Sequence, residues 1–583
     1  MRSWITTLLG PLTMMGCNAP QFVCERDDQC TLASQGVCEP NARCSYPDSD
    51  CPSGQRYSEH AGPSGGECVD AMGSATDPTP DPTTAPTGST AASTTSDDPS
   101  SSEGPDPCLM VDCGPNGQCE PQGEQPTCVC EEGFVDQDLR CIEAGCPGTT
   151  CLWVDAEQGD DANPGTSKAQ PIRTLARAAE LAPSLEPGEA LVLRRNQSWD
   201  EALQLTGLQG TEDAPIIVGA YDLEDNDGPG PLISQGLVLS DSVGVRIQDL
   251  QVTNPTGTAL RLTGVEHATV LNCQAFEAST GCIQVRTGST YTAVIGCEAW
   301  SCGIETYGIS LLAQGAPLGD HHWFVDNRVD GGGTYNSLNI TTGGADDVKV
   351  VGNYLRGSND RGLHSRVNTH AWLVGNVVAR AGDDNDAGLD HAGSGQVIAR
   401  GNIVFDVDLP VWLDGRGEWA FNTVLQSHPY TAITVPNTST GWSMHDNLVI
   451  AMNEPLLSVV NVMDVTADHN VYGRTMAGDC SFEAGAMVVD LAGWQATGQD
   501  GRSRCEVVPM PPLPAMPGST RVWDDDNVLD LAIPEATWGG CADPVGAFDC
   551  DGQPLAAGLP PFEDIGHGWE GPPEVQARVE LVP

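Results

Sequence analysis

Four segments in the second half of the chain share one pattern. They read WLVGNVVA at 372–379, IARGNIVF at 398–405, EWAFNTVL at 418–425 and SMHDNLVI at 443–450. In each segment an asparagine stands at the fifth position, and a short run of apolar or β-branched residues follows it. Such runs are typical of short buried β-strands.

The asparagine recurs over a longer stretch than these four segments. Successive gaps are 26, 23, 26, 20, 25 and 23 residues along the series Asn327, Asn353, Asn376, Asn402, Asn422, Asn447 and Asn470. A second short apolar run lies between most of these asparagines. A loose period of this length, with glycine and aspartate between the runs, indicates the coils of a parallel β-helix. A leucine-rich repeat would need a fixed grid of leucines, and a propeller blade would need about 40–45 residues.

Stacked coils of a β-helix lie ~4.8 Å apart, so equivalent residues form rows along its axis. Asparagines at one corner can then join their amides from coil to coil. We therefore expect these asparagines to be structural rather than catalytic.

Both ends of this array resemble the pectate-lyase-like superfamily. The resemblance is carried by LWVDAEQGDDANPGTSKAQPIRTLARAAE at 152–180, PIIVGAY at 215–221, DLAGWQATGQDGRS at 490–503 and DPVGAFDCDG at 543–552. It implies an all-β right-handed parallel β-helix over residues 152–550. Residues 171–182 read as a helix with Ile172, Leu175 and Ala179 on one face, and such a helix would cover the open first coil. The superfamily holds lyases, hydrolases, epimerases and proteins without a known reaction, so the fold does not decide the activity.

Smaller segments flank the array. Residues 18–70 are rich in cysteine, 71–107 form a Thr/Ser/Pro/Asp-rich linker, and 551–583 are a Pro/Gly-rich tail. The spacing C-x4-C-x5-C-x8-C-x-C-x10-C at 108–141, with CVCEEGF, closely resembles an EGF-like module. This resemblance implies the disulfides Cys108–Cys119, Cys113–Cys128 and Cys130–Cys141. It suggests a spacer or a protein contact, whose partner the sequence does not identify.

The first 17 residues read as an export signal. Arg2 precedes the apolar run 5–15, which is too short to span a bilayer, and Gly16-Cys17 follows. This ending resembles a bacterial lipobox, although Met14 stands where leucine is usual. It implies lipidation of Cys17 and a membrane anchor in the cell envelope or at the cell surface. The alternative is an ordinary signal peptide and a secreted protein.

The cysteine count agrees with export. The chain has 23 cysteines, and lipidation of Cys17 leaves 22. These fall into local clusters of even number, which include the four residues Cys273, Cys282, Cys297 and Cys302. An oxidising compartment is therefore expected, with pairing inside each cluster.

The charge excludes one class of partner. Lys and Arg number 26 against 80 Asp and Glu, a formal net charge of −54. No basic tract could neutralise a phosphate backbone, so we expect no nucleic-acid binding. An acidic polysaccharide would also be repelled unless a bound cation mediated the contact.

Candidate site residues come from aligning the second strand of each coil. If the apolar residues point inward, the outward row reads Ser310, Asn339, His364, Asp390, Trp412 and Thr434, with Arg366 and Asp414 alongside and Arg416 just beyond. We predict catalytic roles for His364, Arg366, Asp390 and Asp414. Substrate binding is assigned to Asn339, Trp412 and Arg416, because an indole stacks on sugar rings and a guanidinium pairs with a uronate.

Two reactions stay open for this patch. Asp390 and Asp414 on neighbouring coils could serve as the acid and base of a glycoside hydrolase. Alternatively, His364 or an arginine could take the proton alpha to a carboxylate, as a polysaccharide lyase requires. The competing hypothesis is a non-enzymatic surface protein that binds glycan or mediates adhesion, because outward strand residues of any solenoid are polar.

An acidic loop precedes the patch. Asp383, Asp384 and Asp386 offer the hard oxygen ligands that Ca²⁺ prefers. Lyases of the resembled superfamily often use calcium to neutralise a uronate, which makes these residues candidate ligands. Acidic loops are also the ordinary surface of so acidic a chain.

Overall fold

The computed structural model describes residues 139–507 except for short gaps, together with smaller parts of the N-terminal region and two C-terminal residues. The gaps are 222–227, 304–305, 314–317, 331–334, 342–346, 359, 367–369, 380–386, 427–429, 453–454 and 475–478. The other described residues are 37–38, 44–47, 51, 55–57, 108, 111, 113, 116–122, 125–131, 133–137, 572 and 575. Cys17 and the predicted linker at 71–107 lie outside them.

The chain divides into two compact units, residues 1–102 and 103–583. In the first, an antiparallel sheet joins β1 (Val37–Cys38), β2 (Cys44–Pro47) and β3 (Gln55–Tyr57). The second unit opens with two hairpins, β4 (Gly117–Gln122) with β5 (Gln125–Cys130) and β6 (Phe134–Gln137) with β7 (Arg140–Glu143). No helix in the described part of the chain is long and apolar enough to cross a membrane.

Disulfides hold these two hairpins, because so short a segment buries little apolar surface. The bonds are Cys108–Cys119, Cys113–Cys128 and Cys130–Cys141, which are the three implied by the cysteine spacing. Cys146–Cys151 then closes the turn into the next strand. The predicted pairings are therefore confirmed, and the EGF-like identity of the module stays a prediction.

From Cys151 onward the chain winds through three sheets of 13 strands each. Sheet 1 contains β8 (Cys151–Val154), β9 (Ala190–Arg194), β12 (Ile216–Tyr221), β15 (Val243–Gln248), β18 (Glu266–Leu271), β21 (Thr290–Ile295), β24 (His322–Val325), β27 (Val348–Val351), β30 (His370–Val374), β33 (Gln396–Arg400), β36 (Arg416–Ala420), β39 (Gly441–His445) and β42 (Val465–Asp468). Sheet 2 contains β10 (Ser198–Trp199), β13 (Leu232–Ile233), β16 (Gln251–Asn254), β19 (Gln274–Ala278), β22 (Glu298–Trp300), β25 (Arg328–Asp330), β28 (Tyr354–Arg356), β31 (Val377–Ala379), β34 (Ile403–Phe405), β37 (Thr423–Gln426), β40 (Leu448–Ala451), β43 (Val471–Arg474) and β46 (Arg504–Val507).

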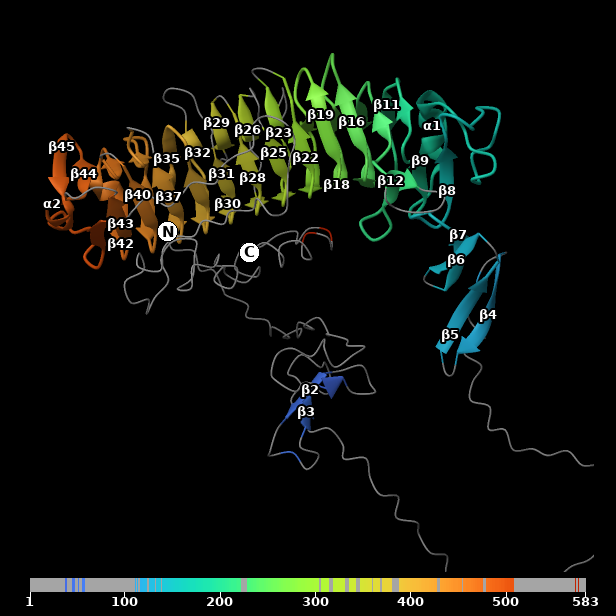
Figure 1. Ribbon diagram of the computed structural model, residues 1–583, viewed down its shortest axis with the longest axis horizontal. Coiled ribbons are helices and arrows are strands. Elements are labelled where there is room, and N and C mark those ends of the chain that lie inside the picture. Colours follow the sequence, from blue (N-terminus) through green and yellow to red (C-terminus); the bar gives the residue numbers. More distant parts are fainter. Residues whose placement is uncertain are drawn as a thin grey trace, which may run out of the picture. The chain divides into compact units, whose positions relative to one another are not determined.

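Sheet 3 contains β11 (Leu203–Thr206), β14 (Leu237–Ser240), β17 (Leu260–Thr263), β20 (Ile283–Arg286), β23 (Tyr307–Leu312), β26 (Asn336–Thr341), β29 (Arg361–Arg366), β32 (Ala387–His391), β35 (Leu409–Leu413), β38 (Ile433–Val435), β41 (Leu457–Val459), β44 (Ser481–Ala484) and β45 (Met487–Asp490). In the repeating coils each strand pairs in parallel with the strand three places further along the chain, and the last pair, β44 with β45, is antiparallel. Figure 1 shows the resulting stack of coils. The predicted fold class, an all-β parallel β-helix, is confirmed.

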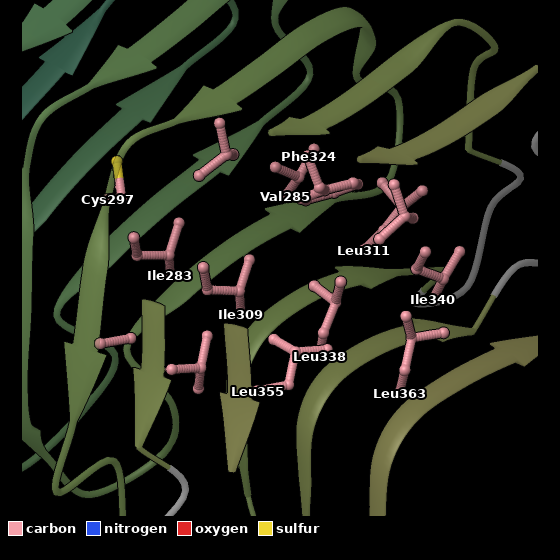
Figure 2. Close-up of a cluster of buried hydrophobic side chains, with 14 of the residues drawn as sticks. Ile283, Val285, Cys297, Ile309, Leu311, Phe324, Leu338, Ile340, Leu355 and Leu363 are labelled. Atoms are coloured by element: carbon pink, nitrogen blue, oxygen red, sulfur yellow. The ribbon is translucent and has the colours of Figure 1, made fainter. Parts of the chain in front are cut away.

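The interior of the β-helix is filled by apolar side chains stacked from coil to coil. Ile309, Leu338 and Leu363 occupy equivalent positions on β23, β26 and β29, and each is at most 1% exposed. Figure 2 shows this row beside Phe324 and Leu355 from the other two sheets. Burial of such rows is the main source of stability in a solenoid, since each coil covers the next.

The predicted asparagine ladder forms at the corner between sheets 1 and 2. Nδ2 of each ladder asparagine from Asn327 to Asn447 donates to Oδ1 of the next, at 2.9–3.2 Å. The backbone N–H of each donates to the same oxygen. The residue before each asparagine has a left-handed backbone, for example Gly401 at φ 64°, which explains the glycines and aspartates at that position.

Two cysteines continue the ladder toward the N-terminus. Cys297 donates its N–H to Oδ1 of Asn327, and the thiols of Cys273 and Cys297 lie 3.7 and 3.6 Å from the carbonyls of Ile247 and Val270. Both cysteines are buried and free, whereas Cys282 and Cys302 form a disulfide. Full pairing of this cluster of four was therefore a wrong prediction, because two of its members replace ladder asparagines.

A cap closes the first coil of the β-helix. Helix α1 (Leu175–Leu181) begins after Thr174, whose hydroxyl accepts from the N–H of Arg177, and a 3₁₀ turn at Ala182–Ser184 follows. The helix is shorter than predicted, because Ile172 forms a β-bridge with Val154 instead. Leu175 and Ala178 face the core, while Ala179 is only half-buried.

The other end of the ladder stops at Asp500. Its buried carboxylate accepts hydrogen bonds from Nδ2 of Asn470, the hydroxyl of Tyr472 and Nε1 of Trp494. Trp494 belongs to α2 (Leu491–Gln495), which packs beside β44 and β45 (Figure 1). A 3₁₀ turn at Val462–Asp464 precedes β42. The predicted boundary at residue 550, and Cys541 and Cys550, lie outside the described residues.

Replacing one ladder asparagine should destabilise the whole stack. Asn402→Ala removes the acceptor of the Asn376 amide and the donor to the Leu373 carbonyl, both buried. Because buried polar groups without partners cost ~1–3 kcal/mol each, we expect a loss of about 3 kcal/mol in the free energy of unfolding in denaturant. Asn437→Ala, at an exposed position, should change it by less than ~0.5 kcal/mol. Equal effects of the two substitutions would contradict the ladder.

Candidate functional site

The outward row predicted on the second strands is present on sheet 3. Backbone register pairs Ser310 with Asn339, Asn339 with His364, His364 with Asp390, Asp390 with Trp412 and Trp412 with Thr434. The alternate residues, such as Leu389 and Val411, are fully buried in the core. The structure therefore brings His364 and Asp390 side by side on adjacent coils.

His364 and Asp390 form the centre of the site. Nδ1 of His364 lies 2.6 Å from Oδ2 of Asp390, and the two residues are 9% and 3% exposed. Within the described residues no hydrogen-bond partner of His364 Nε2 is found, which leaves that nitrogen for a substrate. A carboxylate bound to Nδ1 holds the imidazole in the tautomer whose Nε2 accepts a proton.

Two charged residues beside this pair were missed by the sequence analysis. Nε of Arg361 lies 2.6 Å from Oδ2 of Asp390, and the same guanidinium forms an ion pair with Asp360. Arg361 opens β29, three residues before His364, in register with Asn336. The signal available was the Asp-Arg-Gly sequence at the strand start, but simple alternation back from His364 skips this position.

Other predicted members lie around this centre. Asn339 is 1% exposed and its side-chain amide lies 2.9 Å from that of Asn336. Trp412 is half-buried next to Asp390 on the row, and Arg366 is exposed at the end of β29. Asp414 directly follows β35, its N–H donates to the carbonyl of His391, and one of its carboxylate oxygens accepts from the N–H of Gly415.

The structure separates Arg416 from the patch. Arg416 opens β36 of sheet 1, in register with Gln396, and so does not share the outward face of sheet 3. The turn at Asp414 and Gly415 carries the chain around the corner between these sheets. The predicted calcium ligands Asp383, Asp384 and Asp386 lie outside the described residues. Among the residues that are described, no group of three or more His, Cys, Asp or Glu side chains is arranged to hold a metal.

Successive side chains of β32 point alternately outward and inward, and His391 is an inward one. It follows Asp390 directly, points into the core, and is 0% exposed. Burial lowers its pKa to about 4 despite the nearby carboxylates of Asp390 and Asp414, so the ring is neutral at physiological pH. A neutral imidazole on the inner side of the strand is a core residue and not a second catalytic histidine.

A second polar cluster lies on the outward face of sheet 1. Arg400 forms a bidentate pair with Glu418 at 2.8 and 2.9 Å, and Nε2 of His445 lies 3.3 Å from the same carboxylate. Asp446 accepts from both His445 and His469. Hydrogen bonds to Asp446 and Glu418 raise the pKa of His445 to about 9, and the bond to His445 with the Arg400 pair lowers the pKa of Glu418 to about 2. With every carboxylate already paired, this cluster stabilises the coils.

The cluster makes stability depend on pH. Since the pKa of His445 is about 9 in the folded chain against 6.5 normally, its contribution is fully present below pH ~6.5 and is lost as pH rises through about 9. We expect the wild-type free energy of unfolding to fall over that interval, and the decline to be smaller in His445→Gln. Unfolding in denaturant at pH 6, 7.5 and 9 checks this, and identical slopes for both proteins would contradict it.

Comparisons with known proteins do not assign this chain to a family. No family model matches the chain. A lacto-N-biosidase of Bifidobacterium longum subsp. longum is 30% identical over 132 residues, which are 22% of this chain and only 8% of that protein. The match therefore spans a small part of that much longer relative.

Solved structures to which this chain is similar include a lacto-N-biosidase, a pectate lyase and an alginate lyase. The GH136 lacto-N-biosidase from Eubacterium ramulus has 15% identity and a TM-score of 0.36, covering 62% of this chain and 68% of its own. The pectate lyase Pel9A has 14% identity and a TM-score of 0.34, covering 55% and 79%. The PL6 family alginate lyase AlyGC has 11% identity and a TM-score of 0.33, covering 57% and 56%.

Proposed function

We propose that this chain is a polysaccharide-active enzyme whose reaction centre is the outward face of sheet 3 around His364. The observation that carries the proposal is the hydrogen bond between His364 Nδ1 and Asp390, with Nε2 directed to no described partner. The imidazole–carboxylate pairs of the His445 cluster stabilise the coils, whereas the His364 pair has a ring nitrogen with no partner among the described residues. Such a pair is the usual arrangement for a histidine that transfers protons.

The reaction that this geometry supports best is β-elimination from a uronate. His364 Nε2 would take the proton alpha to the carboxylate, and Asp390 would stabilise the imidazolium that forms. The electron pair left behind would form the double bond as the bond between the β carbon and the glycosidic oxygen breaks, and the leaving oxygen would take a proton from the imidazolium or from water. Arg366, exposed two residues after His364, can pair with the substrate carboxylate. The positive charge of Arg366 would offset locally the repulsion between an acidic substrate and a protein of net charge −54.

Sugar binding would involve the neighbouring coils. Trp412 follows Asp390 on the outward row and offers an indole against which a ring can pack. Asn339 precedes His364 on the same row, but it is 1% exposed and its side chain is bonded to Asn336, so its part would be to position the row rather than to contact the sugar. A glycan lying along the axis would thus pack on Trp412 beside the reaction centre.

Hydrolysis is the second candidate. The 132-residue segment shared with a lacto-N-biosidase favours it, as does the presence of Asp414 one coil beyond Asp390. Against it, Oδ2 of Asp390 already faces both His364 and Arg361 at 2.6 Å. A general acid needs a carboxyl group free to donate to the leaving oxygen. A chain that only binds glycan is the remaining alternative.

The test is a panel of uronate polysaccharides, neutral polysaccharides and oligosaccharides containing lacto-N-biose. Products are read by the ultraviolet absorbance of the unsaturated sugar and by new reducing ends. On an active substrate, His364→Ala and Asp390→Asn should each lower kcat by about a hundredfold or more, because the two side chains act as one unit. Gln204→Ala, on the same outward row six strands earlier, should leave the rate unchanged.

The same panel separates the alternatives. Elimination produces the absorbing product, and Asp414→Asn then keeps most of the activity. Hydrolysis produces reducing ends without that absorbance, and Asp414→Asn then abolishes them. Wild-type rates in both His364→Ala and Asp390→Asn would refute the proposed centre, and retention of a glycan without any product would favour the binding protein.

We propose that Ca²⁺ could bridge the acidic loop before β32 and the carboxylate of an acidic substrate. Asp383, Asp384 and Asp386 carry the oxygen ligands suited to it and directly precede β32, the strand of Asp390. A cation there would help to neutralise an acidic substrate.

We further propose that the chain is exported and held at a bacterial membrane through a lipid on Cys17. The disulfides of the hairpins and of the β-helix support export, since such bonds persist in oxidising compartments. The hairpin module, proposed to be EGF-like, and the linker at 71–107 would then hold the β-helix away from the membrane.

Cys17→Ser tests the anchor in the bacterium that makes the protein. A lipid-anchored chain should leave the membrane fraction or stay unprocessed after this substitution, because lipidation precedes cleavage at that cysteine. Ser45→Ala outside the signal should stay in the membrane fraction like the wild type. A Cys17→Ser protein that is processed and still membrane-bound would refute the lipid anchor.

A further inference from the structure

The outward face of sheet 1 carries an apolar patch in the middle of the β-helix. Its members, called here the outer patch, are Ala293, Ile295, Trp323, Val325, Val351, Trp372 and Val374. They alternate with core residues along each strand, as Trp323 and Val325 do with Phe324. The patch therefore points away from the interior, on the side opposite to the core side chains.

Despite this orientation the outer patch is buried. Trp323 is 1% exposed, and Val325 and Val351 are 0% exposed. Side chains on the outside of a single sheet layer face water unless another part of the protein covers them. Something beyond the three sheets therefore covers this face.

Val575, near the C-terminus, belongs to the same cluster. It is 0% exposed and packs within the outer patch, more than 200 residues beyond Val374 in the sequence. Its N–H donates to the carbonyl of Pro572 at 2.9 Å, and Pro572 is also buried. Pro572 and Val575 are thus bonded to each other and buried, with Val575 on this face.

A buried lysine shows that water is excluded there. Lys349 lies between Trp323 and Trp372 in register, with Nζ 4.7 and 5.2 Å from their ring centroids. The ammonium pairs with Asp347 at 2.7 Å and is only 3% exposed. An outward lysine of a solenoid is normally solvated, so this one is enclosed by a cover.

We propose that Pro572 and Val575 form an intramolecular clamp on the outer patch of sheet 1. The rows to which the patch belongs continue into polar residues at both ends, Arg246 and Gln248 at one end and Arg400 and Glu418 at the other. Released, the patch would expose two indoles and become a surface for self-association.

The full-length chain with Val575→Asp tests the clamp. A carboxylate cannot stay buried among apolar side chains, so the segment should leave the patch. We expect severalfold higher fluorescence of a hydrophobic dye, a red shift of tryptophan emission and concentration-dependent association on size exclusion. Val575→Leu should behave like the wild type. Val488→Asp, at a 68%-exposed position on β45, adds the same charge and should also change nothing.

Hydrogen exchange on the wild-type chain gives a second reading that needs no variant. The amide of Val575 is bonded and buried, so it should exchange at least tenfold more slowly than in the free peptide 571–583. Exchange at the free-peptide rate would overturn the clamp, even if Val575→Asp failed to fold. Wild-type dye binding and emission in a folded Val575→Asp protein would overturn it as well.

Discussion

The coil-to-coil register is the constraint on which every other feature depends. Parallel strands in a solenoid place equivalent residues one above another, and a slip of one residue would turn each outward side chain inward. The asparagine ladder opposes such a slip, because each amide accepts two hydrogen bonds from the preceding coil and donates to the following one. Asp500 completes the series with four donors in place of a further asparagine.

This register explains how much could be predicted from the sequence. The asparagine period indicated the coils, and the inward apolar residues of the second strands were enough to align sheet 3 and to place His364 beside Asp390 across 26 residues. Arg361 was missed because it lies at the start of β29, three residues before His364, and alternation back from His364 skips that position. The free thiols of Cys273 and Cys297 were missed because both cysteines occupy ladder positions, whereas the asparagine series in the sequence begins only at Asn327.

The site itself is a product of stacking rather than of any local motif. His364, Asp390 and Trp412 stand on three successive coils, so none of the three predicts the others by spacing along the chain. Arg361 adds a positive charge beside the row, and its guanidinium pairs with the carboxylates of both Asp360 and Asp390. Roles in a reaction cannot be read from register, because a solenoid places polar side chains outward whether or not they act.

The outward faces of sheets 1 and 3 differ in whether their rows of side chains are covered by another part of the chain. On sheet 3 the row is polar and its members bond to one another, so it needs no apolar cover and leaves Nε2 of His364 without a described partner. On sheet 1 the equivalent rows are apolar over four coils except at Lys349, and uncovered they would place two indoles in water. The sequence alternation is the same in both cases. A face that must stay open to a ligand therefore carries polar residues, whereas a face built from Trp, Val and Ile requires a segment such as that around Val575.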